Sequence, residues 1–140
     1  MAEGILRDKL RKRNITAEID SAGLEKFHIG DPPDDRAVLV AKKYGIDITG
    51  HRARIVNDDD FKRFDRIYIM DSYHYHHLSM LARTDAMMDK VDYIMNRINP
   101  GKNQAVKDPW YDDIPSFEKV FLQLDAACEK IADELAAFTP

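Results

Sequence analysis

The sequence has 140 residues, 44% of them hydrophobic and 33% charged, which is the composition of one soluble globular domain covering residues 1–140. Its net charge of −4 argues against nucleic acid as the main partner, because neutralising phosphates requires a basic face. The apolar runs are too short to span a bilayer and no apolar signal segment follows Met1, so we expect no membrane partner. The lone cysteine, Cys128, excludes an internal disulfide and is typical of a reducing compartment, which predicts a cytoplasmic protein.

The first half of the chain alternates between helical and extended patterns. Helices are predicted where apolar residues recur every three or four positions and a capping residue precedes them. Strands are predicted where short β-prone runs end at a turn. In chain order, these patterns predict a helix over 2–13, a strand over 16–21, a loop over 24–33, a helix over 34–44 capped by Asp34, and a helix capped by Asn57.

The second half continues the alternation. It contains, in chain order, a short apolar strand over 66–70, a helix over 72–81 capped by Ser72, a second strand over 91–95, a long polar loop over 99–115 and an amphipathic helix over 116–138. Strands that alternate with helices predict an α/β fold with three layers, α/β/α, around a small parallel sheet. Because ligands of such sheets bind beyond the carboxyl ends of the strands, the segments that follow the strands are the candidate functional sites.

The sharpest candidate is the sequence Asp108-Pro109-Trp110-Tyr111 in the long polar loop. A loop carboxylate beside two aromatic rings can donate a proton to the leaving oxygen of an aromatic ester, and the rings can wall a slot for a flat substrate. Taken by itself, the motif has a simpler interpretation as a turn, since Asp-Pro commonly opens turns and the aromatic rings can cap a core.

Other polar groups have weaker functional interpretations. His51, followed by Arg52 and Arg54, can bind an anion or form an exposed basic loop. His74 and His77 share a helical face and resemble half of a zinc site, but the sequence supplies no obvious third ligand, so we predict no metal. The acidic runs at 31–35 and 58–60 lack the alternating spacing of a calcium loop and are better explained as helix caps.

Together these pieces resemble the low-molecular-weight protein-tyrosine phosphatases, in order and over nearly the whole chain. The matching segments are Met1-Ala2-Glu3-Gly4, Ile19 to Gly23, Phe27 to Asp34, Gly45 to Arg54, Phe61 to Asp71, Asp108 to Tyr111, and Phe117 to Cys128. The resemblance implies that a cysteine thiolate attacks phosphorus, that an arginine holds the phosphate, and that an aspartic acid protonates the departing phenol. It implies no cofactor.

The family's nucleophile and arginine lie in a loop of pattern Cys, five residues, Arg, Ser, Pro, between a first strand and the first helix. That position precedes Met1, and Cys128 lies in the wrong helix to replace it. The resemblance therefore implies that the first, central strand and the phosphate loop are missing from these 140 residues, and we expect this chain to be inactive by itself.

By position, Asp108 matches the general acid, and Phe27, Trp110 and Tyr111 match the walls of a phosphotyrosine slot. Ser21 and His51 match residues that hydrogen-bond to the phosphate loop and support it, and we expect them to be left without that partner. The implied substrate is a phosphotyrosine-containing protein or a small aryl phosphate.

Three alternatives remain open. An arsenate reductase of the same fold needs further cysteines. A protein-arginine phosphatase fits the fold, although the two adjacent aromatic residues favour phosphotyrosine. A non-catalytic pseudo-phosphatase that only binds phosphoproteins or another partner is the alternative outside catalysis. Exposed strand edges also predict that the isolated chain folds poorly or forms a strand-swapped homo-oligomer.

Overall fold

The computed structural model describes residues 1–138. Its elements are, in order, α1 (Ala2–Lys12), a 3-10 turn (Lys26–His28), α2 (Asp35–Lys43), α3 (Asp60–Arg63), β1 (Ile67–Ile69), α4 (Ser72–Leu81), α5 (Asp85–Met88), β2 (Val91–Tyr93), a second 3-10 turn (Ile94–Arg97) and α6 (Ile114–Phe138). The predicted helices and the two later strands are present with small shifts of their ends. None of the helices in residues 1–138 is long and apolar enough to cross a membrane.

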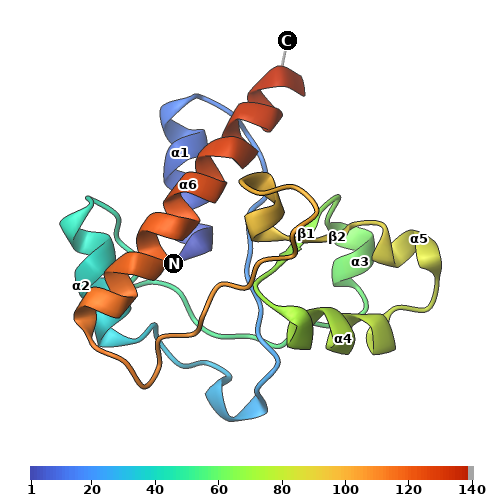
Figure 1. The fold of residues 1–140 in the computed structure, drawn as a ribbon, viewed down its shortest axis with the longest axis horizontal. Coiled ribbons are helices and arrows are strands. Elements are labelled where there is room, and N and C mark those ends of the chain that lie inside the picture. Colours follow the sequence, from blue (N-terminus) through green and yellow to red (C-terminus); the bar gives the residue numbers. More distant parts are fainter. Residues whose placement is uncertain (139–140) are drawn as a thin grey trace.

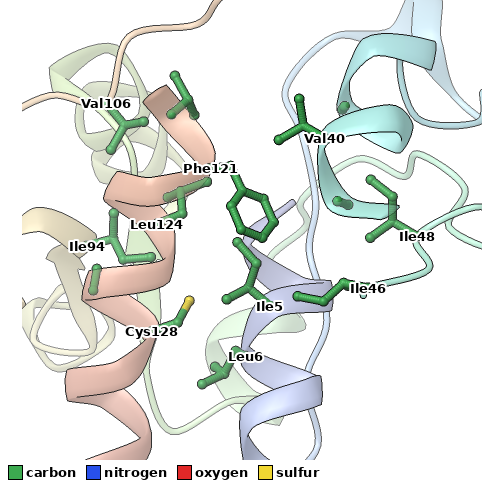
Figure 2. Packing of buried hydrophobic residues seen from close by; sticks show 14 of the residues in the cluster. Ile5, Leu6, Val40, Ile46, Ile48, Ile94, Val106, Phe121, Leu124 and Cys128 are labelled. Carbon is green, nitrogen blue, oxygen red and sulfur yellow. The ribbon is translucent and has the colours of Figure 1, made fainter. Parts of the chain in front are cut away.

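The main core lies between α1, α2 and α6. Ile5 and Leu6 of α1 face Phe121 and Cys128 of α6, and Val40 of α2 approaches from the other side (Figure 2). The tight packing of α1 begins at Gly4, where an added Cβ would lie 2.6 Å from Ile48 Cγ2. The apolar spacing that predicts helix α1 thus also identifies the face that it buries.

The two strands form a parallel pair with helices on both sides (Figure 1). Ile67 pairs with Val91 and Ile69 with Tyr93, in register. Ile69 and Tyr93 pack with α3 and α4 in a second core cluster, whereas Tyr68 packs against the main core. This alternation separates two apolar layers, and the predicted α/β fold with a small parallel sheet is confirmed.

The strand predicted over residues 16–21 is absent as a strand. These residues are irregular, and the first ladder contact comes later, where Gly23 forms an isolated parallel bridge with Ile55. The alternation of the sequence predicts an extended backbone, but a strand also requires a hydrogen-bonded neighbour. In the described part of the chain, no backbone of another segment lies beside residues 16–22 in that way.

Two predicted caps were wrong by one or more residues. Asp71, rather than Ser72, caps α4 by accepting the backbone N–H of His74 at 2.9 Å. Asn57 does not begin α3 directly; its side chain accepts the N–H of Asp59, and the helix begins at Asp60. Adjacent Asx and Ser residues are interchangeable caps by type, so their order in the sequence does not decide which one is used.

Candidate active site

The loop that carries Asp108 is built as a turn. Asp108 Oδ1 accepts the backbone N–H of Trp110 at 3.0 Å, which is the local hydrogen bond expected of an Asp-Pro turn. The turn directs two aromatic side chains to solvent, with Trp110 49% exposed and Tyr111 96% exposed. The motif therefore forms a turn, and both of its aromatic rings are exposed.

A second exposed loop lies beside the first. Phe27, in the 3-10 turn, is 87% exposed, and the ring of His28 lies 5.7 Å from the ring of Trp110 at a tilt of 56°. Two backbone hydrogen bonds hold this loop, from Gly30 N to Ala53 O and from Ala53 N to Asp31 O. The two loops thus meet at the rings of His28 and Trp110, which are separated by about 80 positions in the sequence, and this edge is called the rim below.

Arg36, at the start of α2, ties the loop over residues 108–112, named the acid loop after Asp108, to the body of the protein. Its guanidinium donates to the backbone carbonyls of Trp110 at 2.8 Å and Asp112 at 2.6 Å. The same group is held by both carboxylate oxygens of Asp34 and lies 4.4 Å above the ring of Phe117. The hydrogen bond from Arg36 also lowers the pKa of Asp34, so the pair stays charged at neutral pH. We infer that Arg36 fixes the position of the acid loop.

Replacing Arg36 by alanine is expected to loosen this loop without unfolding the protein. Trp110 is the sole tryptophan, so its fluorescence anisotropy decay reports the loop directly, and we expect a faster local component in the variant. Arg36→Lys should not restore the slow decay, because an ammonium cannot replace the guanidinium fork. Arg52→Ala is the control, since the hydrogen bonds that Arg52 makes within residues 1–138 go to carbonyls of its own turn. Equal decays in all four proteins would contradict the anchoring role.

Ser21 and His51 meet at the first turn of α1. The Ser21 hydroxyl donates to Glu3 Oε2 at 2.8 Å, and His51 Nδ1 lies 2.9 Å from the same oxygen. Residues 1–140 contain no phosphate loop for these two side chains to support, and the Glu3 carboxylate binds both of them instead. No hydrogen bond or ring contact within residues 1–138 joins this cluster to Asp108.

Next to this cluster, Arg54 connects three segments. It donates to both carboxylate oxygens of Asp60, at 2.9 and 3.0 Å, and to Asp20 at 3.0 Å. Asp60 is buried, and burial by itself raises its pKa, but the hydrogen bonds from Arg54 and from the Asn57 N–H prevail and lower it. The cost of the buried carboxylate is thereby offset by a charged partner.

Arg54→Met is expected to destabilise the protein by roughly 2–3 kcal/mol, below the 3–5 kcal/mol of a fully buried pair because Arg54 is about one-third exposed. The pKa of Asp60 is lowered by folding, so its contribution is present above the unfolded pKa of about 4 and is lost as the pH falls through the folded value. Urea unfolding should therefore show a smaller difference in the free energy of unfolding between the unaltered protein and Arg54→Met at pH 3 than at pH 7. Arg83→Met, which breaks an exposed pair with Asp58, is the control.

The remaining candidates are not gathered into a site. Cys128 is buried in α6, and burial raises the pKa of its thiol to about 12, which is opposite to what a nucleophile needs. His74 Nδ1 accepts the backbone N–H of Met70, a structural use of the ring. Among residues 1–138 no group of three or more His, Cys, Asp or Glu side chains is arranged to hold a metal ion.

A model of the low molecular weight phosphotyrosine protein phosphatase family matches residues 1–138. The chain belongs to this family. A phosphatase of that name from Schizosaccharomyces pombe is 35% identical over 127 residues, which cover 89% of this chain and 80% of the relative. Among solved structures, a protein tyrosine phosphatase from Entamoeba histolytica aligns with a TM-score of 0.88 at 28% identity, covering 97% of this chain and 87% of that one. A Drosophila arginine phosphatase aligns with a TM-score of 0.85, also at 28% identity, covering 95% and 87% of the two chains.

The sequence did not reveal that Glu3 contacts Ser21 and His51, or that Arg36 contacts the loop of Asp108. Glu3 looks like an ordinary acidic residue in the first turn of a helix, and Arg36 looks like a solvated residue beside a cap. The only local signal for Arg36 was its place two residues after Asp34, within reach of that carboxylate. Their long-range partners become visible only in three dimensions.

Proposed function

We propose that these 140 residues supply the acid catalyst and the substrate rim of a protein-tyrosine phosphatase. The observation that carries this proposal is the shared rim, where the loop of Asp108, Trp110 and Tyr111 lies against the loop of Phe27 and His28. Flat rings on two facing loops suit an aryl group, and an exposed carboxylate beside them suits its leaving oxygen.

The family chemistry requires two further groups, a cysteine thiolate and an arginine in a Cys-x5-Arg loop. The thiolate attacks phosphorus and forms a phosphocysteine while the bond from phosphorus to the tyrosine oxygen breaks. Asp108 gives its proton to that oxygen, so the product leaves as a neutral phenol. The Asp108 carboxylate then takes a proton from water as the water oxygen attacks phosphorus, which releases phosphate and regenerates the thiolate.

Residues 1–140 do not contain that loop. Their only cysteine is Cys128, and the sixth residue after it is Glu134 rather than arginine. The buried position and raised pKa of Cys128 further oppose a catalytic role. We therefore propose that this chain does not hydrolyse phosphate esters until a Cys-x5-Arg loop is added to it. A single cysteine also favours a reducing, cytoplasmic setting.

Ser21, His51 and Glu3 have a supporting role in this proposal. A phosphate loop that leads into α1 would pass the first turn of that helix, where these three residues meet. Their hydroxyl, imidazole and carboxylate can hydrogen-bond to such a loop and fix its shape, and the N-terminus of α1 can face the phosphate.

The test compares the 140-residue chain with the same chain preceded by a β-strand and a Cys-x5-Arg-Ser-Pro loop. We expect no hydrolysis of para-nitrophenyl phosphate above buffer by the first and clear turnover by the second. Changing the added cysteine to serine should abolish that turnover. Hydrolysis by the 140-residue chain would overturn the proposal, and a folded but inactive completed protein would favour a non-catalytic phosphoprotein-binding role. Turnover of phosphoarginine but not phosphotyrosine would favour the arginine phosphatase alternative.

A further inference from the structure

Helix α4 carries a histidine-rich tract that the proposed phosphatase function does not use. Figure 1 shows α4 at the margin of the molecule, and Leu78 is the buried residue among Ser72–Leu81. None of the ten residues of α4 is Asp, Glu, Lys or Arg, although these four types make up 33% of the chain. Surface helices normally place charged side chains on their solvent face. The exposed face of α4 instead carries tyrosine, histidine and methionine side chains.

One face of α4 gathers two imidazole rings and a thioether. Met80 follows His76 by four positions and His77 by three, and side chains at these spacings are neighbours on a helix, with about 5–6 Å between their Cβ atoms. On a helix with 3.6 residues per turn, the direction of Met80 falls between those of the two histidines. Helical side chains lean toward the N-terminus, so the Met80 sulfur can reach back to both rings.

The three donor groups are free in the described structure. No hydrogen bond, ion pair or ring contact within residues 1–138 involves the ring of His76, the ring of His77 or the sulfur of Met80. Met80 is 68% exposed, His76 is exposed and His77 is half-buried. The ring of His74 differs, because its Nδ1 already accepts a backbone N–H. The three free groups can therefore turn toward one ion from solvent without breaking a contact.

The chemistry of these donors selects a soft, singly charged ion. Thioether sulfur is a ligand of Cu(I), whereas Zn²⁺ is bound by thiolate, imidazole and carboxylate. Two imidazoles and a thioether are all neutral, and α4 contains no carboxylate to balance a second positive charge. Arg83, three positions after Met80, is paired with Asp58, so its charge is already compensated. The absence of a metal site built from His, Cys, Asp and Glu within residues 1–138 does not cover this set, because one donor is a methionine.

We propose that α4 is a binding site for one Cu(I) ion, which is held by an imidazole nitrogen of His76, an imidazole nitrogen of His77 and the sulfur of Met80. Three ligands satisfy Cu(I), which accepts three-coordinate sites. All three come from one helix, so the site is assembled by local structure and needs no movement of another element. It lies outside the rim and depends neither on Asp108 nor on a phosphate loop.

The test adds Cu(I), as its coloured complex with bicinchoninate, to the 140-residue chain under anaerobic, reducing conditions. We expect the protein to remove a single equivalent of copper from the chelator, and the NMR signal of the Met80 ε-methyl group to shift. Met80→Leu and His76→Gln should each weaken binding by roughly tenfold or more, since each removes one ligand. Both side chains are exposed, so the far-ultraviolet circular dichroism of the variants should be unchanged.

Two further variants serve as controls, and both should bind copper as the unaltered protein does. Met88→Leu makes the same chemical change on α5, where the side chain packs against the second core cluster. Cys128→Ala removes the buried thiol, which is the other soft donor of α6 and a competing ligand if it is reached.

Four outcomes would overturn the proposal. Unchanged affinity in Met80→Leu would remove the thioether from the site. An equal loss in Met88→Leu would mean that methionines bind copper without a defined site. A loss in Cys128→Ala alone would place the ion on the buried thiol. Failure of the folded protein to take any copper from the chelator would show that α4 does not bind Cu(I).

Discussion

Asp108→Asn is expected to lower the turnover of phosphotyrosine by about a hundredfold or more in the protein completed with a Cys-x5-Arg loop. Asparagine keeps the shape of the side chain and can still accept the Trp110 N–H at the turn, so the loop should retain its structure. It has no proton to give to the phenolate oxygen and cannot act as a base toward water. The loss should therefore appear in kcat with little change in KM.

The nature of the leaving group sharpens this test. Para-nitrophenolate is a much better leaving group than the phenolate of tyrosine and needs less help from an acid, so the loss on para-nitrophenyl phosphate should be smaller. Asp112→Asn is the matched control, because it removes a carboxylate from the same loop and leaves the backbone carbonyl that Arg36 binds. Similar losses in the two variants would show that the loop charge matters and that Asp108 has no special role.

Phe121→Ala is expected to destabilise the 140-residue chain by roughly 3–5 kcal/mol, the usual cost of truncating a buried phenylalanine. The Phe121 side chain is only 1% exposed and stacks on the ring of Tyr44, with centroids 4.6 Å apart. Figure 2 shows it at the centre of the main core, between Leu124 and Ile5. A loss of this size is a large part of the 5–15 kcal/mol that holds an ordinary domain together.

Leu122→Ala is the control for this substitution, because the neighbouring side chain on α6 is 49% exposed. Urea unfolding followed by far-ultraviolet circular dichroism gives both free energies of unfolding, and the control should change by less than about 1 kcal/mol. If the two variants lost equal stability, the packing of α1, α2 and α6 around Phe121 would not be the main core in solution.

Local signals in the sequence predicted the helices well. Asp34 accepts the N–H of Arg36 at the start of α2, as its type and position suggested, and Gly45 takes a positive φ of 79° after the end of the helix. The strand over residues 16–21 was predicted incorrectly for a non-local reason. Its alternation resembles that of a strand, but whether a partner lies beside it depends on the arrangement of the whole fold.

The candidate site was only partly predictable for the same reason. The motif at 108–111 is contiguous, so its turn and its exposed rings could be foreseen from residue types alone. The contact between His28 and Trp110, and the carbonyl bonds of Arg36 to the acid loop, join residues more than 70 positions apart. Such contacts leave no pattern in the local sequence. A resemblance to a family identifies them only where the roles of the contacting residues are already known.

The pairing of the first helix with the last has a consequence for how this protein is made. Lys9 binds Glu129 at 2.6 Å across 120 positions, and Arg13 binds Asp133 at 2.7 Å across the same interval. On a ribosome that adds roughly 5–20 residues per second, the apolar face of α1 therefore waits about 6–24 seconds for its partner. The main core closes only after α6 has been made, so the nascent chain exposes Ile5, Leu6 and Leu10 until then. We expect this delay to appear as chaperone binding to ribosome-bound chains that end before α6.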